Sequence, residues 1–158
     1  MINQTGAHKP HRLAAYATGG ESTPPFELVL VVDPDHDDSR ALTQIIEDRD
    51  RHALTTSSAG EALDALECEP IDVVVLGLGE RDASGFALLS TIRQRREFDE
   101  VPLLVMPAHG EPATISRVID LGANAVLPKP LKPALVKMLL ILAVEQTRRQ
   151  RRAPPARG

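Results

Sequence analysis

Short apolar runs alternate with amphipathic segments along most of the chain, beginning near Glu27. Five runs have the length and apolar composition typical of strands, and they cover residues 28–32, 53–57, 71–76, 101–106 and 125–127. After each run, apolar residues recur at the three- and four-residue spacing of a helix. Strands joined in this way pair in parallel through right-handed crossovers. The pattern therefore predicts an α/β fold with a doubly wound, five-stranded parallel sheet covered by helices on both faces.

The same pattern predicts where function is to be sought. In open sheets of this class, ligands and reactive groups gather in the crevice beyond the carboxyl ends of the strands. We therefore expect the functional site in the segments that directly follow Val32, Leu76 and Met106, and around Leu127.

The two ends of the chain differ from its middle in composition. Residues 1–26 mix Gly, Thr, Pro and His without periodicity, so we expect a disordered leader there, followed by one domain over residues 27–147. Residues 148–158 contain five arginines and are expected to form a basic tail that first continues the last helix. No aromatic residue is interleaved with these arginines, so nucleic-acid binding is not expected. The formal net charge is −4, and the body of the chain is therefore more acidic than the whole.

Composition also argues against several classes of function. The single cysteine, Cys68, has no second thiol for a disulfide or a thiolate metal site. The five histidines are scattered without ligand spacing, so we expect no metal ion and no cofactor. The longest apolar run, residues 138–144, is far shorter than the roughly 18 residues that a membrane span needs. We expect a soluble, cytoplasmic protein.

Five stretches, taken in order, carry a resemblance to a known family. They are residues 28–33 (LVLVVD), 58–63 (SAGEAL), 71–76 (IDVVVL), 84–86 (SGF) and 122–130 (GANAVLPKP). Together they resemble the receiver domain of two-component response regulators. The resemblance implies a flavodoxin-like (βα)5 fold with strand order 2-1-3-4-5, and a role in signal transduction between proteins.

The resemblance also implies a phosphorylation pocket, and here the sequence departs from the family. The family places a phospho-accepting aspartate after the third strand, acids that hold Mg²⁺ after the first, a hydroxyl after the fourth and a lysine after the fifth; the cations offset the charge of the phosphoryl group. Gly77 stands at the acceptor position, Pro107 at the hydroxyl position, and Pro34 where a second acid follows Asp33. Lys129 matches the family lysine.

Two further positions complete this comparison. Asp35 partly replaces the acid missing at Pro34, and Val126 stands where the family has an aromatic residue that reorients during signalling. Because glycine has no side chain, no acyl phosphate can form at position 77. The sequence therefore predicts a degenerate phosphorylation pocket made of Asp33, Asp35, Gly77, Pro107 and Lys129.

These departures favour a pseudo-receiver that is not an enzyme, has no catalytic residues and signals by protein–protein interaction. One alternative is a phosphorelay receiver with a substitute acceptor at Glu80, Asp82 or Ser84. Another is a small-ligand binder in the vacated crevice, although the chain has one tyrosine and no tryptophan for stacking a flavin, and no nucleophile–base pair.

Lys129 carries two structural expectations. We expect it to form an ion pair with Asp33 across the strand ends. The resemblance implies a cis peptide bond between Lys129 and Pro130.

The last helix predicts a partner interface. Four residues at helical spacing are expected to cover the sheet: Leu135, Met138, Leu139 and Leu142. We then expect a second apolar surface, free to bind a partner, made of Val126, Val136, Leu140 and Val144. The expected partners are a histidine kinase, a regulator or an effector, or a second copy of the chain through this helix. Leu140→Glu is expected to abolish that contact while the monomer stays folded.

Overall fold

The computed structural model describes residues 27–79 and 83–152. Its first strand starts at Glu27, the first of the described residues. The expected leader, the loop positions Glu80 and Asp82, and residues 153–158 of the expected tail lie outside the described residues.

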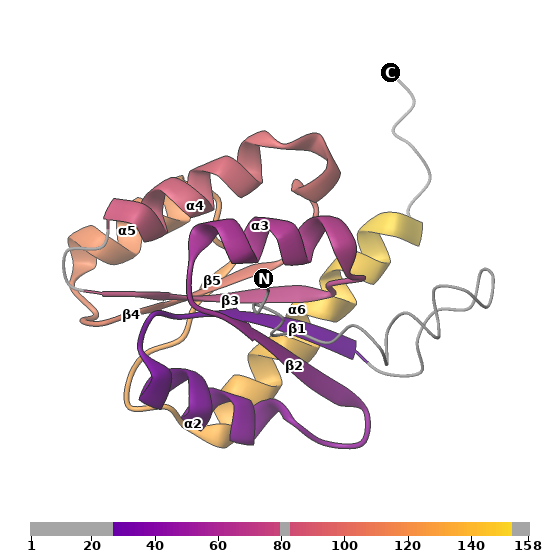
Figure 1. The fold of residues 1–158 in the computed structure, drawn as a ribbon, viewed down its shortest axis with the longest axis horizontal. Coiled ribbons are helices and arrows are strands. Elements are labelled where there is room, and N and C mark those ends of the chain that lie inside the picture. The colour runs from indigo at the N-terminus through magenta and orange to yellow at the C-terminus, as the bar shows by residue number, and fades with distance from the viewer. Residues whose placement is uncertain (1–26, 80–82, 153–158) are drawn as a thin grey trace, which may run out of the picture.

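The core of the fold is a five-stranded parallel sheet in the order β2-β1-β3-β4-β5, and the predicted fold class and strand order are confirmed (Figure 1). The strands are β1 Glu27–Val32, β2 Arg51–Thr56, β3 Val73–Leu78, β4 Leu103–Pro107 and β5 Ala125–Val126. β1 and β3 lie in the middle of the sheet, and they are almost wholly apolar because both of their faces are covered.

Helices cover the two faces of the sheet as separate layers (Figure 1). One layer consists of α2 His36–Ile46 and α6 Pro133–Arg152; the other consists of α3 Ala59–Cys68, α4 Ala83–Gln94 and α5 Pro112–Asp120, with a short 3-10 turn at Arg96–Phe98. Each layer buries its own apolar cluster against the strands. Within the described residues, no helix combines the length and the apolar character required to cross a bilayer.

Local sequence signals fix where several helices begin. The Asp35 carboxylate caps α2 by accepting from the backbone N–H groups of Asp37 at 2.9 Å and Asp38 at 3.1 Å. Ser58 caps α3: its hydroxyl accepts from Glu61 N–H at 3.2 Å and donates to the Glu61 carboxylate at 3.1 Å. These contacts satisfy N–H groups that the first turn of a helix leaves without partners.

Strand β3 lies two residues later than the apolar run predicted. The structure places Gly77 and Leu78 inside β3, paired with Met106 and Pro107 of β4. The pairing continues past the strand, because Ala108 N–H donates to the Leu78 carbonyl at 2.9 Å. Gly77 is therefore part of the sheet and does not begin a loop.

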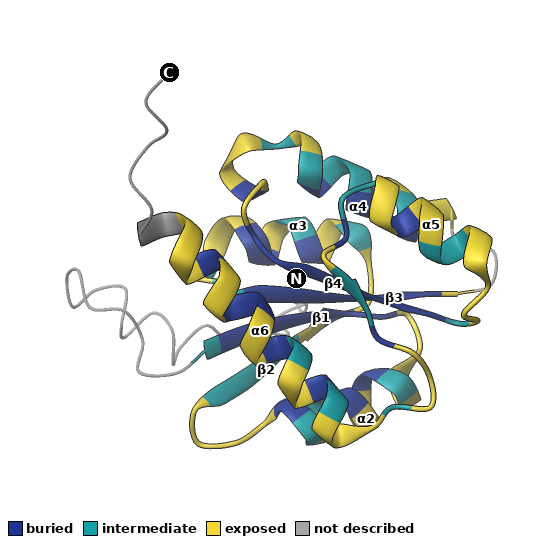
Figure 2. Ribbon diagram, turned by 180° about the vertical axis from the view of Figure 1, so that it is seen from behind, coloured by how far each residue is buried: buried dark blue, intermediate teal, exposed yellow. Residues whose placement is uncertain are grey.

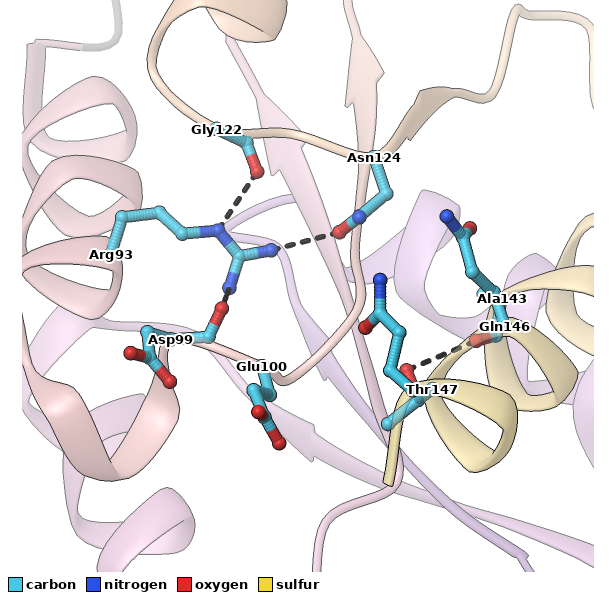
Figure 3. A pocket seen from close by; sticks show the side chains of 9 residues that line it. Arg93, Asp99, Glu100, Gly122, Asn124, Ala143, Gln146 and Thr147 are labelled. Atoms are coloured by element: carbon cyan, nitrogen blue, oxygen red, sulfur yellow. Dashed lines mark hydrogen bonds between the residues drawn. The ribbon is translucent and has the colours of Figure 1, made fainter. Parts of the chain in front are cut away.

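Arg93 joins the loops at the amino ends of β4 and β5, a role that the sequence did not reveal (Figure 3). Its guanidinium donates to the carbonyls of Gly122 at 2.8 Å, Phe98 at 3.2 Å and Asp99 at 3.1 Å, and to Asn124 Oδ1 at 2.8 Å. Gly122 ends α5 with φ of 111°, and a Cβ there would also collide with the Arg93 side chain. One half-buried cation thus ties together α4, the turn after it and the approach to β5.

The last helix packs with a different face from the one predicted (Figure 2). Val136, Leu140 and Val144 are 1%, 0% and 5% exposed and belong to the core, so the prediction that they form a partner surface is wrong. Met138 and Leu142, predicted to cover the sheet, are 49% and 56% exposed. The other two residues of the predicted stripe, Leu135 and Leu139, are half-buried. The fourth residue of the predicted surface, Val126 on β5, is half-buried against the α3–α5 layer.

The sequence of α6 explains why the predicted face of this helix is not the one that packs on the sheet. The helix carries two apolar stripes, and periodicity alone cannot rank them. The stripe that faces the sheet continues through two small residues, Ala143 and Thr147, which are also buried. A stripe that stays small or apolar over the whole contact buries more of the helix than the predicted stripe, which would turn Gln146 toward the sheet.

The orientation of α6 can be tested with a matched pair of variants. Leu140→Glu places a charge in the core and is expected to cost more than about 4 kcal/mol, which leaves little cooperative fold. Leu142→Glu, two positions further on, is expected to change the free energy of unfolding by less than about 1 kcal/mol. Urea denaturation followed by circular dichroism measures both. Similar losses in the two variants would contradict the observed orientation of α6.

Candidate functional site

The predicted pocket residues lie at the carboxyl ends of the strands, as expected. Asp33 directly follows β1, Gly77 lies in the neighbouring β3, Pro107 ends β4, and Lys129 lies in the loop between β5 and α6. The structure brings Asp33 and Gly77 into direct contact, whereas Lys129 makes its own contact elsewhere.

The Asp33 carboxyl group lies on the face of Gly77 where a side chain would start. A Cβ built on Gly77 would overlap Asp33 Oδ2 and Cγ at distances that real Cβ atoms essentially never show. Asp33 is 5% exposed, so its side chain is enclosed in this position. The space beside Gly77 is therefore filled by the carboxyl group of Asp33, which directly follows the neighbouring strand β1.

The two oxygens of Asp33 have different surroundings. Oδ1 accepts the backbone N–H of Asp35 at 2.9 Å. Oδ2 is buried and has no hydrogen-bond partner among residues 27–79 and 83–152. Burial raises the pKa of Asp33 above the usual aspartate value, and the hydrogen bond from Asp35 only partly opposes this effect. The site favours the neutral form of the carboxyl group more than water does.

Lys129 pairs with Asp38 of α2, and the predicted pair with Asp33 is wrong. The Lys129 ammonium lies 2.5 Å from Asp38 Oδ2. Asp33 points inward over Gly77, while Asp38 lies in the first turn of α2 at the surface, where a long side chain reaches it easily. The predicted cis peptide bond between Lys129 and Pro130 is confirmed.

The other acids that the structure describes near Asp33 do not form a site for Mg²⁺. Asp35 is engaged as the cap of α2, and the backbone N–H groups of Asp38 and Asp37 lower its pKa. Pro34 and Gly77 supply no oxygen ligand from a side chain. No group of three or more His, Cys, Asp or Glu in the described part of the chain is placed to hold a metal ion. The donor set therefore does not fit a cation that requires near-octahedral oxygen ligands.

The described residues beside Gly77 line a small cavity. It measures about 60 Å³ and is lined by residues that include Pro34, Ser58, Gly77 and Ser84. Small-molecule and cofactor sites typically measure about 300–1,000 Å³. This cavity has no room for a flavin, and Pro107 offers no hydroxyl.

The contact between Asp33 and Gly77 generates a double-mutant test. Gly77→Ala is expected to cost about 1–3 kcal/mol of unfolding free energy, because the new methyl group displaces the enclosed Asp33 carboxyl. In an Asp33→Ala background the obstacle is gone, and the same change is expected to be neutral or to stabilise by about 0.5–1 kcal/mol, as Ala does in place of Gly within a strand. Chemical denaturation of the four proteins gives the coupling energy. Equal costs in the two backgrounds would refute the contact.

A second test uses the raised pKa of Asp33. Between the ordinary aspartate pKa near 4 and the raised value, the folded protein binds the Asp33 proton and the unfolded chain does not, so this group's contribution to stability falls as pH rises. Asp33→Asn copies the neutral form and removes that loss. The free energy of unfolding of the variant minus that of the wild type is therefore expected to increase with pH above about 4 and then level off. A pH series of urea denaturations measures this difference. A difference that is flat, or that decreases with pH, would show that Asp33 is not destabilised when charged.

Comparison with known sequences agrees with the resemblance. A family model described as the response regulator receiver domain matches residues 29–140. The two-component response regulator ORR11 of Oryza sativa is 27% identical over 128 residues, which cover 80% of this chain and 85% of the relative. The transcriptional regulatory protein KdpE of Staphylococcus aureus is 32% identical over 106 residues, covering 65% of this chain and 43% of the relative.

Solved structures with the same fold include two that cover most of the described chain. A CheY-like receiver domain protein from Methanospirillum hungatei has a TM-score of 0.70 at 19% identity, over 79% of this chain and 98% of the other. NtrX from Brucella abortus has a TM-score of 0.73 at 24% identity, over 84% of this chain and 31% of the other. Because the family model matches residues 29–140, which is more than half of the chain, the chain belongs to the response regulator receiver domains of two-component signalling.

Proposed function

We propose that this receiver passes its signal by binding protein partners and does not carry an aspartyl phosphate. The observation that supports this most directly is the contact between Asp33 and Gly77. An acyl phosphate needs a carboxylate oxygen at the mouth of β3, and that space contains no side chain of β3 and is filled by Asp33.

Asp33 is a poor substitute acceptor. Its Oδ2 is enclosed against Gly77, and burial favours the neutral form of the group, whereas attack on phosphorus requires the carboxylate. The charge that gathers during phosphoryl transfer also needs a cation close by. Lys129 pairs with Asp38, and the acids among residues 27–79 and 83–152 form no cluster that could hold Mg²⁺.

The switch that follows phosphorylation in the family also lacks its parts. Pro107 has no hydroxyl with which to contact a phosphoryl group, and it lies within β4, paired with Leu78. Val126 is β-branched, so its χ1 angle has few alternatives, and it lies half-buried on β5. A pocket that neither binds the group nor relays its presence leaves the surface of the domain as the route for signalling.

In this proposal the protein is a non-enzymatic module in the cytoplasm. It docks on a histidine kinase, a regulator or an effector, and its docking does not depend on an earlier chemical modification. A phosphorelay receiver with a substitute acceptor is the competing proposal, and the test below separates the two.

Treatment with acetyl phosphate or beryllofluoride in the presence of Mg²⁺ is expected to leave the protein unchanged. Intact-mass spectrometry is expected to find no phosphoryl adduct, and amide NMR signals of Gly77, Ala108 and Lys129 are expected to stay in place. A receiver with an intact acceptor, treated in parallel, serves as the positive control.

A stoichiometric, Mg²⁺-dependent adduct would overturn the proposal. Four single variants would then locate the acceptor: Asp33→Asn, Glu80→Gln, Asp82→Asn and Ser84→Ala. Only the variant that lacks the true acceptor would lose the adduct.

A further inference from the structure

A second cavity lies at the amino ends of β4 and β5, at the opposite end of the strands from the crevice beside Gly77 (Figure 3). It measures about 270 Å³, just below the range typical of drug-sized ligands, so it suits a smaller molecule. Its walls come from the end of α4 and the loop after it, the turn between α5 and β5, and the second half of α6. They include six charged or polar residues: Arg93, Asp99, Glu100, Gln146, Thr147 and Gln150.

The charges of this cavity disfavour an anionic ligand. Arg93 is its only lining cation, and the guanidinium already makes four hydrogen bonds to oxygens of the surrounding loops. Since a guanidinium has five N–H groups, little of its donor capacity remains for a ligand. Asp99 and Glu100 lie on the same side of the cavity and would repel an anion (Figure 3). Arg93 therefore shapes the wall, and the acids set the sign of the charge that fits.

Several side chains of the lining are not engaged by the protein itself. The carboxylates of Asp99 and Glu100 make no hydrogen bond or ion pair within residues 27–79 and 83–152. The same holds, in this described part of the chain, for the side-chain amides of Gln146 and Gln150. These two glutamines are four residues apart and so lie on one side of α6. Figure 3 shows the loop with Glu100 on one side and α6 with Gln146 on the other.

Thr147 adds a buried oxygen to the wall on α6. Its side chain is enclosed, with 8% of the residue exposed, and its hydroxyl donates to the Ala143 carbonyl at 3.2 Å. A hydroxyl has one hydrogen to donate, so the Thr147 oxygen can serve a ligand only as an acceptor. A buried oxygen of this kind favours a ligand that brings N–H or O–H donors.

We infer that this cavity binds a small aliphatic amine in its protonated form. An ammonium group has three donors and no acceptor, which matches carboxylate, hydroxyl and amide oxygens as partners. Its hydrogen bonds to Glu100 would be charge-assisted, and these are stronger than bonds between neutral groups. The amide oxygens of Gln146 and Gln150 would receive donors from the side of α6. The inference goes beyond the proposed function, because it gives the domain a ligand site remote from the crevice at Gly77.

A basic side chain of a partner protein matches the cavity less well than a free amine. Protein interfaces surround their charged contacts with apolar residues that supply a core. None of the large apolar residues that the structure shows to be exposed lines this cavity: Ile119, Met138, Ile141 and Leu142. The acids also form no metal-binding group of three or more within the described residues.

The test uses the full-length chain and a matched pair of small molecules. One is the diamine putrescine, and the other is its diol analogue, in which hydroxyl groups replace both ammonium groups. In NMR titrations, putrescine is expected to shift the side-chain amide signals of Gln146 and Gln150 and the backbone signal of Glu100 to saturation. The diol at the same concentrations is expected to leave them in place. Raising the salt concentration is expected to weaken the binding of putrescine.

Two single variants locate the site. Glu100→Gln keeps the shape of the side chain and removes its charge, and it is expected to weaken putrescine binding by about tenfold or more. Asp64→Asn is the matched control, because Asp64 is an exposed acid on α3 that does not line the cavity. Its affinity for putrescine is expected to equal that of the wild type. Circular dichroism is expected to show the same fold in all three proteins.

Four outcomes would overturn the inference. They are equal shifts with the diol, equal losses in the two variants, the same shifts with Mg²⁺ in place of putrescine, and tighter binding of the end-blocked tripeptide Ala-Lys-Ala than of putrescine. The last result would assign the cavity to a lysine of a partner protein. None of these measurements involves a phosphodonor, so their failure leaves the proposed function unaffected. A phosphoryl adduct, in turn, would overturn the proposed function without changing the affinity for putrescine.

Discussion

The enclosed contact between the Asp33 carboxyl and Gly77 determines the state of the whole crevice. Two side chains cannot occupy that space, so the absence of one at position 77 is what allows Asp33 to be buried. Burial in turn leaves Oδ2 without a partner and destabilises the charge. With Asp33 turned inward, Lys129 pairs with Asp38 at the surface. In this arrangement the Asp33 carboxyl is enclosed beside Gly77 and the Lys129 ammonium is paired at the surface.

Much of this could be predicted from the sequence, for reasons that belong to particular residues. Buried parallel strands must be apolar on both faces, so the runs that contain β1 and β3 stand out clearly. The changes at Gly77 and Pro107 are visible because each removes a functional group outright.

The wrong predictions concern places where two similar groups could each make the same contact. α6 has two apolar stripes, and only contact with the sheet decides that Leu140 is buried and Leu142 is not. Asp33 and Asp38 are both within reach of a lysine after β5, and the choice depends on which carboxyl group the interior encloses. The role of Arg93 was not predicted at all. Its partners are mostly backbone carbonyls, and the sequence pattern does not show which carbonyls a side chain will reach.

The filled space at Gly77 has a consequence for any attempt to place a side chain at this position. An aspartate introduced at position 77 would meet the Asp33 carboxyl where its own Cβ must lie. A single replacement therefore disturbs the packing around Asp33 before the new carboxylate can act, and only a paired change at positions 33 and 77 avoids that collision.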